Sequence, residues 1–68
     1  MLKISLKAAR VNAGLTQKEV AKHLKVSNKT IHNWENGITS PSFEYIDALC
    51  DLYNTPYNNL NFLPTNSL

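Results

Sequence analysis

The sequence predicts an all-α fold, in which five short helices pack around one small core. Three observations predict this class: apolar residues recur at helical spacing, helix start and stop signals punctuate the chain, and no stretch alternates apolar and polar residues as a strand does. A chain of 68 residues has room for a single domain. We place that domain at residues 1–63 and expect a frayed tail at residues 64–68.

The first two helices are expected at residues 3–13 and from Thr16 to about Lys25. An apolar stripe runs along the first helix, and Gly14 follows it where a C-terminal cap belongs. The second helix begins with a capping box, in which the Thr16 hydroxyl accepts from the Glu19 backbone N–H and the Glu19 carboxylate accepts in return from Thr16 N–H. The stripe of the first helix consists of Leu2, Leu6, Ala9 and Ala13.

The third helix has two chemically different sides. It is expected to run from Ser27, as the N-cap, to Asn36, and Gly37 stops it. At about 100° per residue, its inward side carries the apolar residues and its outward side carries only hydrogen-bonding groups. The outward residues are Asn28, Lys29, His32 and Asn33.

The fourth helix has two possible starting points, and the fifth is short. The fourth begins at Ser40 or Ser42, and Pro41 favours the earlier start because proline suits the first helical position. Its apolar stripe has Phe43 beside it. A short fifth helix is expected over residues 55–60, where a Thr-Pro pair supplies the N-cap and the first helical residue. The stripe of the fourth helix consists of Ile46, Leu49, Cys50 and Tyr53.

Charge is distributed unevenly along the chain. All seven basic residues lie in the first 29 positions, together with Glu19, so that this part carries a net charge of +6. The remainder has four acidic residues and no basic one, and carries −4. Such an asymmetry is typical of a protein with one face that meets an anion. The alternative is that two solvated faces simply differ in charge.

Composition excludes several classes of protein. A hydrophobic fraction of 43% is too high for a disordered chain, and no apolar run approaches the roughly 18 residues of a membrane span. The first residues lack the apolar core of a signal peptide. A single cysteine excludes an internal disulfide, and His23, His32 and Cys50 lack the spacing of zinc ligands. We therefore expect a cytoplasmic protein that is not an enzyme and has no membrane, metal, cofactor or small-molecule partner.

Two short helices joined by a brief turn, the second with a polar outer side, form a helix-turn-helix over about residues 16–36. The major groove of DNA, about 12 Å wide, admits a helix and presents a distinct pattern for each base pair. Asn can bond twice to adenine and Lys can donate to guanine, although a merely solvated helix face is the alternative. The predicted base contacts are Asn28, Lys29 and Asn33, with His32 and Thr30 as second candidates.

Landmark residues fall in register along residues 6–60: Leu6-Lys7, Arg10, Gly14-Leu15-Thr16-Gln17, Val20-Ala21, Leu24, Val26-Ser27, Thr30-Ile31, Trp34-Glu35-Asn36-Gly37, Pro41, Leu49, Leu52-Tyr53 and Leu60. With these residues the sequence resembles the Xre/Cro-type helix-turn-helix family of phage repressors. The resemblance implies a five-helix, lambda-repressor-like domain that binds double-stranded DNA as a dimer. Its phage-like character associates the protein with a mobile element.

The resemblance also implies roles for individual residues. It places Gln17 and Asn36 on DNA phosphates, and the Gln17 backbone N–H at the start of its helix is free to meet one. It makes Arg10 and Glu35 an ion pair between the first and third helices. It puts Lys25 where the family often has Gly, so that a positive φ there would be strained. The lysines expected to add attraction for phosphates are Lys7, Lys18 and Lys25.

Two functions fit these patterns. The first is a sequence-specific transcriptional regulator, a repressor that binds a pseudo-palindromic operator as a homodimer. Leu60, Phe62 and Leu63 are its candidate dimer contacts, unless they pack back onto the first helix. The second is a protein-interaction module of the same fold, such as an anti-repressor or an antitoxin partner, which the acidic, Tyr-rich second half favours.

Overall fold

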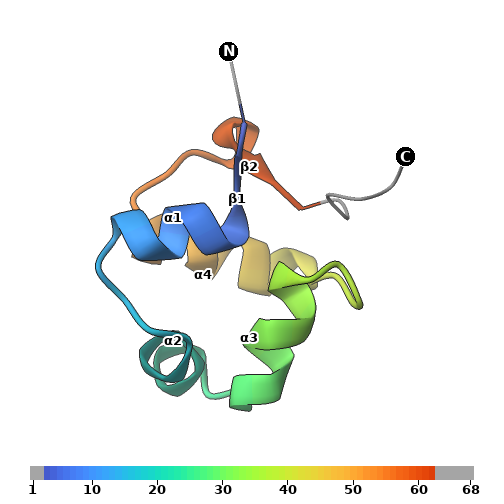
Figure 1. Ribbon diagram of the computed structural model, residues 1–68. Coiled ribbons are helices and arrows are strands. Elements are labelled where there is room, and N and C mark those ends of the chain that lie inside the picture. Colours follow the sequence, from blue (N-terminus) through green and yellow to red (C-terminus); the bar gives the residue numbers. More distant parts are fainter. Residues whose placement is uncertain (1–2, 63–68) are drawn as a thin grey trace.

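The structure, a computed structural model, describes residues 3–62 (Figure 1). Four α-helices in the described residues surround one core, and two short strands pair beside it, which confirms the all-α class apart from this small sheet. None of the described helices is long and apolar enough to cross a membrane. In chain order the elements are β1 (Ile4–Ser5), α1 (Leu6–Asn12), α2 (Gln17–Leu24), α3 (Asn28–Glu35), α4 (Phe43–Leu52), the 3-10 turn η1 (Tyr57–Asn59) and β2 (Leu60–Asn61).

The predicted fifth helix is wrong. Over residues 55–60 the chain makes only the single turn η1 and then extends into β2. β2 runs parallel to β1, with Ile4 beside Leu60 and Ser5 beside Asn61, so the two ends of the described chain lie side by side (Figure 1). The backbone groups that a fifth helix would have paired internally are instead used between two distant segments.

The local chemistry of residues 55–60 explains why no helix forms there. The Thr55 hydroxyl, expected to cap the helix, donates to the Tyr53 carbonyl at 3.0 Å and is not available as a cap. Pro56 has extended backbone angles, with ψ at 151°, and so cannot be the first residue of a helix. The chain therefore enters the turn without a side-chain cap.

Two helices begin later than the sequence favoured. α1 starts at Leu6 because Ser5 is its N-cap, with the Ser5 hydroxyl accepting from Ala8 N–H at 3.0 Å. α4 starts after Ser42, which decides between the two alternatives against the earlier start at Ser40. The predicted stripe of α1 loses Ala13, which lies exposed after the end of the helix, and Phe43, expected beside the stripe of α4, is 81% exposed.

The remaining helix starts are confirmed in detail. In the capping box of α2, Thr16 N–H donates to the Glu19 carboxylate at 2.9 Å and Glu19 N–H donates to the Thr16 hydroxyl at 3.1 Å. The bond from Thr16 N–H, and a second from the Thr16 hydroxyl to the same carboxylate at 3.2 Å, hold the pKa of the Glu19 carboxyl below its usual value. Ser27 caps α3, accepting from Thr30 N–H at 3.1 Å. Both helices of the predicted helix-turn-helix thus begin where local sequence signals place them.

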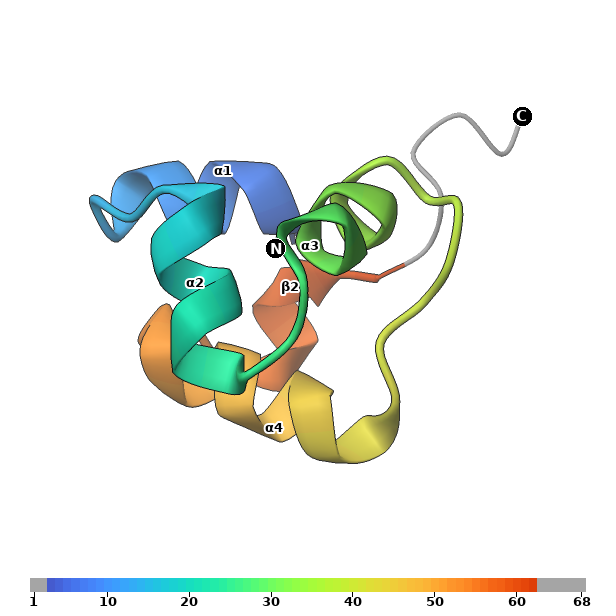
Figure 2. The ribbon, with the colours of Figure 1, turned by 90° about the horizontal axis from the view of Figure 1, so that it is seen from below.

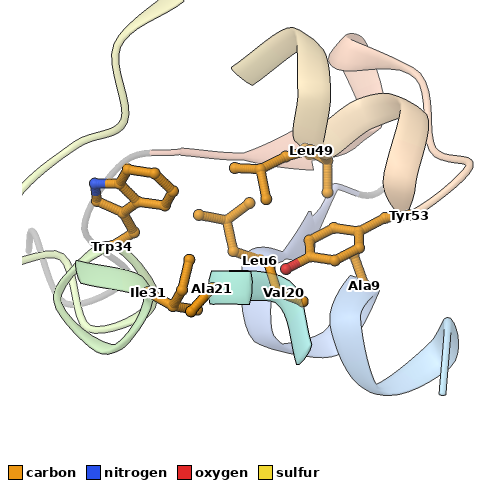
Figure 3. Packing of buried hydrophobic residues seen from close by; sticks show 9 residues of the cluster. Leu6, Ala9, Val20, Ala21, Ile31, Trp34, Leu49 and Tyr53 are labelled. Atoms are coloured by element: carbon orange, nitrogen blue, oxygen red, sulfur yellow. The ribbon is translucent and has the colours of Figure 1, made fainter. Parts of the chain in front are cut away.

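Every α-helix contributes to one shared core (Figure 3). The inner side of α3 supplies Ile31 and Trp34, which are 1% and 8% exposed. Because the same core holds α1, α2, α4 and β2, the orientation of α3 depends on the packing of the whole domain. The buried residues of this hydrophobic core are Leu6, Ala9, Val20, Ala21, Ile31, Trp34, Leu49, Tyr53 and Leu60.

Tyr53 gives the core a dependence on alkaline pH. It is 5% exposed, and burial, reinforced by the charge of Glu35, raises its pKa to about 12. Because the pKa of an unfolded tyrosine is about 10, the contribution of Tyr53 to the free energy of unfolding is complete below pH about 10 and is lost as pH rises through 12.

Tyr53→Phe removes this titration, so above pH 11 its free energy of unfolding should fall on the order of 1–2 kcal/mol less, from its value at pH 8, than that of the parent. Urea unfolding at pH 8 and pH 11 measures this difference, and the exposed Tyr57→Phe serves as the control; equal pH dependence in both variants would contradict it.

A residue with a left-handed backbone conformation follows each α-helix within two positions. Three of these positions hold Gly or Asn, which adopt it readily, but α2 ends at Lys25 with φ of +59°. The positive φ foreseen for Lys25 is thus present. The geometry is fixed by the bond from Val26 N–H to the Ala21 carbonyl at 3.0 Å, which closes the helix end. The four residues are Gly14, Lys25, Gly37 and Asn54.

Replacing Lys25 by Gly should stabilise the domain, because Gly removes the left-handed strain. We expect a gain of about 0.5–1 kcal/mol, or a rise in Tm of roughly 4 °C. Lys22→Gly removes the same charge from the interior of α2 and should instead cost about 1 kcal/mol. Thermal melts of the two variants test the pair, and a fall in Tm for Lys25→Gly would show that the Lys25 side chain contributes more than its backbone costs.

Candidate nucleic-acid interface

α2 and α3 form a helix-turn-helix whose turn lies at residues 25–27. Figure 2 looks almost along α3, with α2 crossing beside it, α1 at one side of the core and α4 at the other. The apolar side of α3 faces this core, so its opposite side faces outward. The motif predicted at residues 16–36 is therefore formed, with Thr16 and Asn36 as its two limiting caps.

The outward side of α3 carries free hydrogen-bonding groups. Asn28 and Lys29 are exposed and Asn33 is half-buried. Within residues 3–62 none of these three side chains makes a hydrogen bond to another residue. Amide and ammonium groups that are accessible and unpaired can bond to base edges without first breaking an internal contact.

The two second candidates are partly engaged within the helix. The Thr30 hydroxyl shares a hydrogen bond of 2.8 Å with the Ser27 hydroxyl, so it belongs to the cap of α3. His32 is exposed, and its Nδ1 lies 3.3 Å from the Asn36 amide nitrogen. That amide nitrogen also donates to the His32 carbonyl at 2.8 Å. One of the two amide hydrogens of Asn36 is therefore used internally, which leaves less donor capacity for a phosphate.

Arg10 and Glu35 form the ion pair that the resemblance implied. Arg10 Nε lies 2.7 Å from Glu35 Oε2 and its second terminal nitrogen lies 3.3 Å from Oε1, so the contact is bidentate. The side chains are only 11% and 2% exposed. The other Arg10 terminal nitrogen donates to the Leu15 carbonyl at 2.9 Å, and the bond to Glu35 raises the pKa of the guanidinium. The pair thus ties α1 and the following loop to the end of α3.

A third donor to Glu35 was missed by the sequence reasoning. Gln17 Nε2 donates to Glu35 Oε1 at 2.9 Å, although Gln17 was expected to contact only phosphate. A carboxylate can accept about four hydrogen bonds, and the bidentate guanidinium of Arg10 supplies only two. The acceptor sites left on Glu35 could therefore have indicated a further donor. The Gln17 backbone N–H remains at the first position of α2, outside the helical ladder.

Positive and negative side chains come from different elements. Glu35, in the Arg10 pair, is the only carboxylate within residues 3–62 that forms an ion pair, so the lysine ammonium groups there lack carboxylate partners. Most of the other carboxylates lie on α4, where Glu44, Asp47 and Asp51 are exposed. No cluster of three or more His, Cys, Asp or Glu in the described part could hold a metal ion. The exposed lysines predicted to meet phosphates are Lys7, Lys18 and Lys25.

The three predicted dimer contacts have different outcomes. Leu60 is wrong as a surface contact, because β2 pairing places it in the core with 1% exposure. Phe62 is half-buried and stacks on Tyr57, with ring centroids 5.5 Å apart. Leu63 and the tail at residues 64–68 lie outside the described residues. Tyr57, which the sequence analysis did not single out, is 57% exposed.

Comparison with known proteins gives both a family and two relatives. The helix-turn-helix family model matches residues 6–60. Antitoxin PezA of Streptococcus pneumoniae serotype 4 (strain ATCC BAA-334 / TIGR4) is 35% identical over 57 residues, covering 84% of this chain and 36% of PezA. The HTH-type transcriptional regulator ImmR of Bacillus subtilis (strain 168) is 41% identical over 49 residues, covering 72% of this chain and 39% of ImmR. The chain therefore spans less than two fifths of either relative. No solved structure matches significantly.

Proposed function

The chain belongs to the Xre-like helix-turn-helix family, and we propose that it is a sequence-specific transcriptional regulator that binds double-stranded DNA. The observation that carries the proposal is the outward side of α3, where the Asn28, Lys29 and Asn33 side chains have no internal hydrogen bond among residues 3–62. The name of the relative ImmR, a transcriptional regulator, supports the same function.

In this proposal α3 lies in the major groove and α2 crosses the DNA backbone. Asn28, Lys29 and Asn33 contact base edges, with His32 and Thr30 at the margin. The backbone N–H at the start of α2 meets a phosphate, as N-terminal helix amides do. The side chains that add phosphate contacts are Lys18, Asn36, Lys7 and Lys25, and Gln17 contributes its backbone N–H.

The protein would act as a homodimer that represses transcription by covering a pseudo-palindromic operator. Its α-carbon frame measures 30 × 23 × 21 Å, a size at which two copies in contact can place their recognition helices about 34 Å apart, the separation that one DNA turn requires. The exposed Tyr57, stacked on Phe62, is the contact we favour. No charged residue follows Asp51, and an uncharged patch can meet its own copy across a two-fold axis without repulsion.

Selection of bound sites from a random duplex library tests the proposal. We expect two half-sites related by a dyad about one helical turn apart, and an affinity that falls with salt. The salt slope should be shallow, because residues 37–40 carry no cation and α3 offers only Lys29. Tyr57→Ser should weaken dimer formation in sedimentation experiments. Absence of binding to any duplex at about 50 mM salt would overturn the proposal.

The alternative function is a protein-interaction module. The name of the relative PezA, an antitoxin, and the exposed carboxylates of α4 favour it. It predicts that the domain binds no duplex DNA at low salt. The same titration therefore separates the two functions.

A further inference from the structure

We propose that Gln17 is a positioning residue, which sets the angle between α2 and α3 by holding Glu35, and that it affects base reading through this angle. The inference rests on the proposed DNA-binding function. It gives the Gln17 side chain a role different from the phosphate contact that the family resemblance implies.

The position of the bond in the motif is the first argument. Gln17 is the first residue of α2 and Glu35 is the last residue of α3, so they stand at the two free ends of the helix pair. At the other end the helices are joined covalently through residues 25–27. The bond of 2.9 Å from Gln17 Nε2 to Glu35 Oε1 closes the open end. A pair of helices joined at one end only could open more easily than a pair held at both.

The chemistry of the bond is the second argument. A carboxylate only accepts hydrogen bonds, so Glu35 determines which way the amide of Gln17 points: Nε2 faces the carboxylate and Oε1 faces away. Glu35 is itself fixed by the bidentate contact with Arg10 and is 2% exposed. One of the two amide hydrogens is therefore used internally, and the side chain presents less donor capacity to a phosphate than a free glutamine would.

The two possible roles of Gln17 differ in what they do to specificity. A phosphate contact carries no sequence information, so its loss weakens binding to every duplex and lowers the salt slope. A change in the angle between α2 and α3 displaces Asn28 and Asn33 relative to the bases while the phosphate contacts persist. Its loss should therefore weaken binding to the operator selectively.

The test compares Gln17→Met with Lys18→Met, its neighbour in the first turn of α2. Affinities are measured by titration on the selected operator and on random duplex, over a range of salt. Gln17→Met should bind the operator about tenfold more weakly, because losing a charge-assisted hydrogen bond lowers the population of the base-reading helix angle by about that factor, and should bind random DNA within about twofold of the parent. Lys18→Met should weaken binding to both duplexes similarly and reduce the salt slope by about 1.

Two checks make the outcome decisive. Thermal melts must show that Gln17→Met remains folded at the temperature of the titrations. NMR exchange of the Gln17 side-chain amide in the free protein should show one protected proton, which reports the bond without DNA. Equal losses on operator and random DNA, unchanged operator affinity, or an unprotected amide would each overturn the inference. If the parent binds no DNA while its amide is protected, the proposed function fails and the bond to Glu35 does not.

Discussion

Arg10→Met is expected to cost about 3–5 kcal/mol of the free energy of unfolding, because it leaves a buried carboxylate without its cation. The Glu35 side chain is 2% exposed, and Arg10 supplies two of its three side-chain donors. The remaining donor, the amide of Gln17, is neutral and cannot balance the charge. Burial of an unpaired carboxylate therefore dominates over the apolar contacts that Met would add.

This cost is large relative to the stability of so small a domain. At about 0.05–0.15 kcal/mol per residue, a chain of 68 residues has roughly 3–10 kcal/mol in total. The variant should therefore be substantially unfolded or have a much lower Tm. Urea unfolding followed by fluorescence measures the loss directly, because Trp34 is the only tryptophan and is buried in the core at 8% exposure.

Two further variants separate the ion pair from other effects of the substitution. Arg10→Met combined with Glu35→Leu removes both charges and should recover most of the stability, since apolar replacement of a buried pair is often neutral. Lys7→Met removes an exposed charge from the same helix and should change stability by no more than about 0.5 kcal/mol. A loss for Arg10→Met no greater than that for Lys7→Met would mean that Glu35 is solvated or held by other donors.

The parts of the fold that local chemistry decides were predictable. The capping box of Thr16 and Glu19, the cap at Ser27 and the stop at Gly37 each depend on residues within four positions of one another. The segment after α4 was not predictable, because its structure depends on pairing between Leu60 and Ile4 at the other end of the chain. A Thr-Pro pair has the same local signals whether or not that partner is present.

The candidate site likewise has features that follow from the local sequence and features that depend on contacts between distant residues. The polar outer side of α3 follows from its helical period, so the outward position of Asn28 and Asn33 could be predicted from the sequence, and their contact with bases stays a prediction. The contact of Gln17 with Glu35 joins different helices, and no spacing rule encodes it. Leu60 shows the same limit for apolar residues. From the sequence alone, an apolar side chain near a terminus can pack on the core or on a partner, and only the pairing of β2 with β1 shows that Leu60 packs on the core.

Asn33→Ala is expected to weaken operator binding by about 1–3 kcal/mol, or roughly 5- to 150-fold, with Tm unchanged or slightly higher. The Asn33 side chain makes no hydrogen bond to the other described residues, so its removal leaves no buried group unsatisfied. Its backbone carbonyl accepts from Ile38 N–H at 2.9 Å, and that bond survives the substitution. Alanine also has a higher helix propensity than asparagine, which favours the folded state.

The reason to expect selectivity is that an amide on α3 reads bases and does not neutralise phosphates. Asn33→Ala should leave affinity for random duplex within about twofold and keep the salt slope, while discrimination is relaxed at one base pair of each half-site. Asn58→Ala, which removes an exposed amide from η1, is the matched control and should change neither affinity. Titration of both variants against single-base operator variants, beside thermal melts, locates the contact. A lower Tm with operator affinity retained would assign Asn33 to the fold, and base reading would then fall to Asn28 and Lys29.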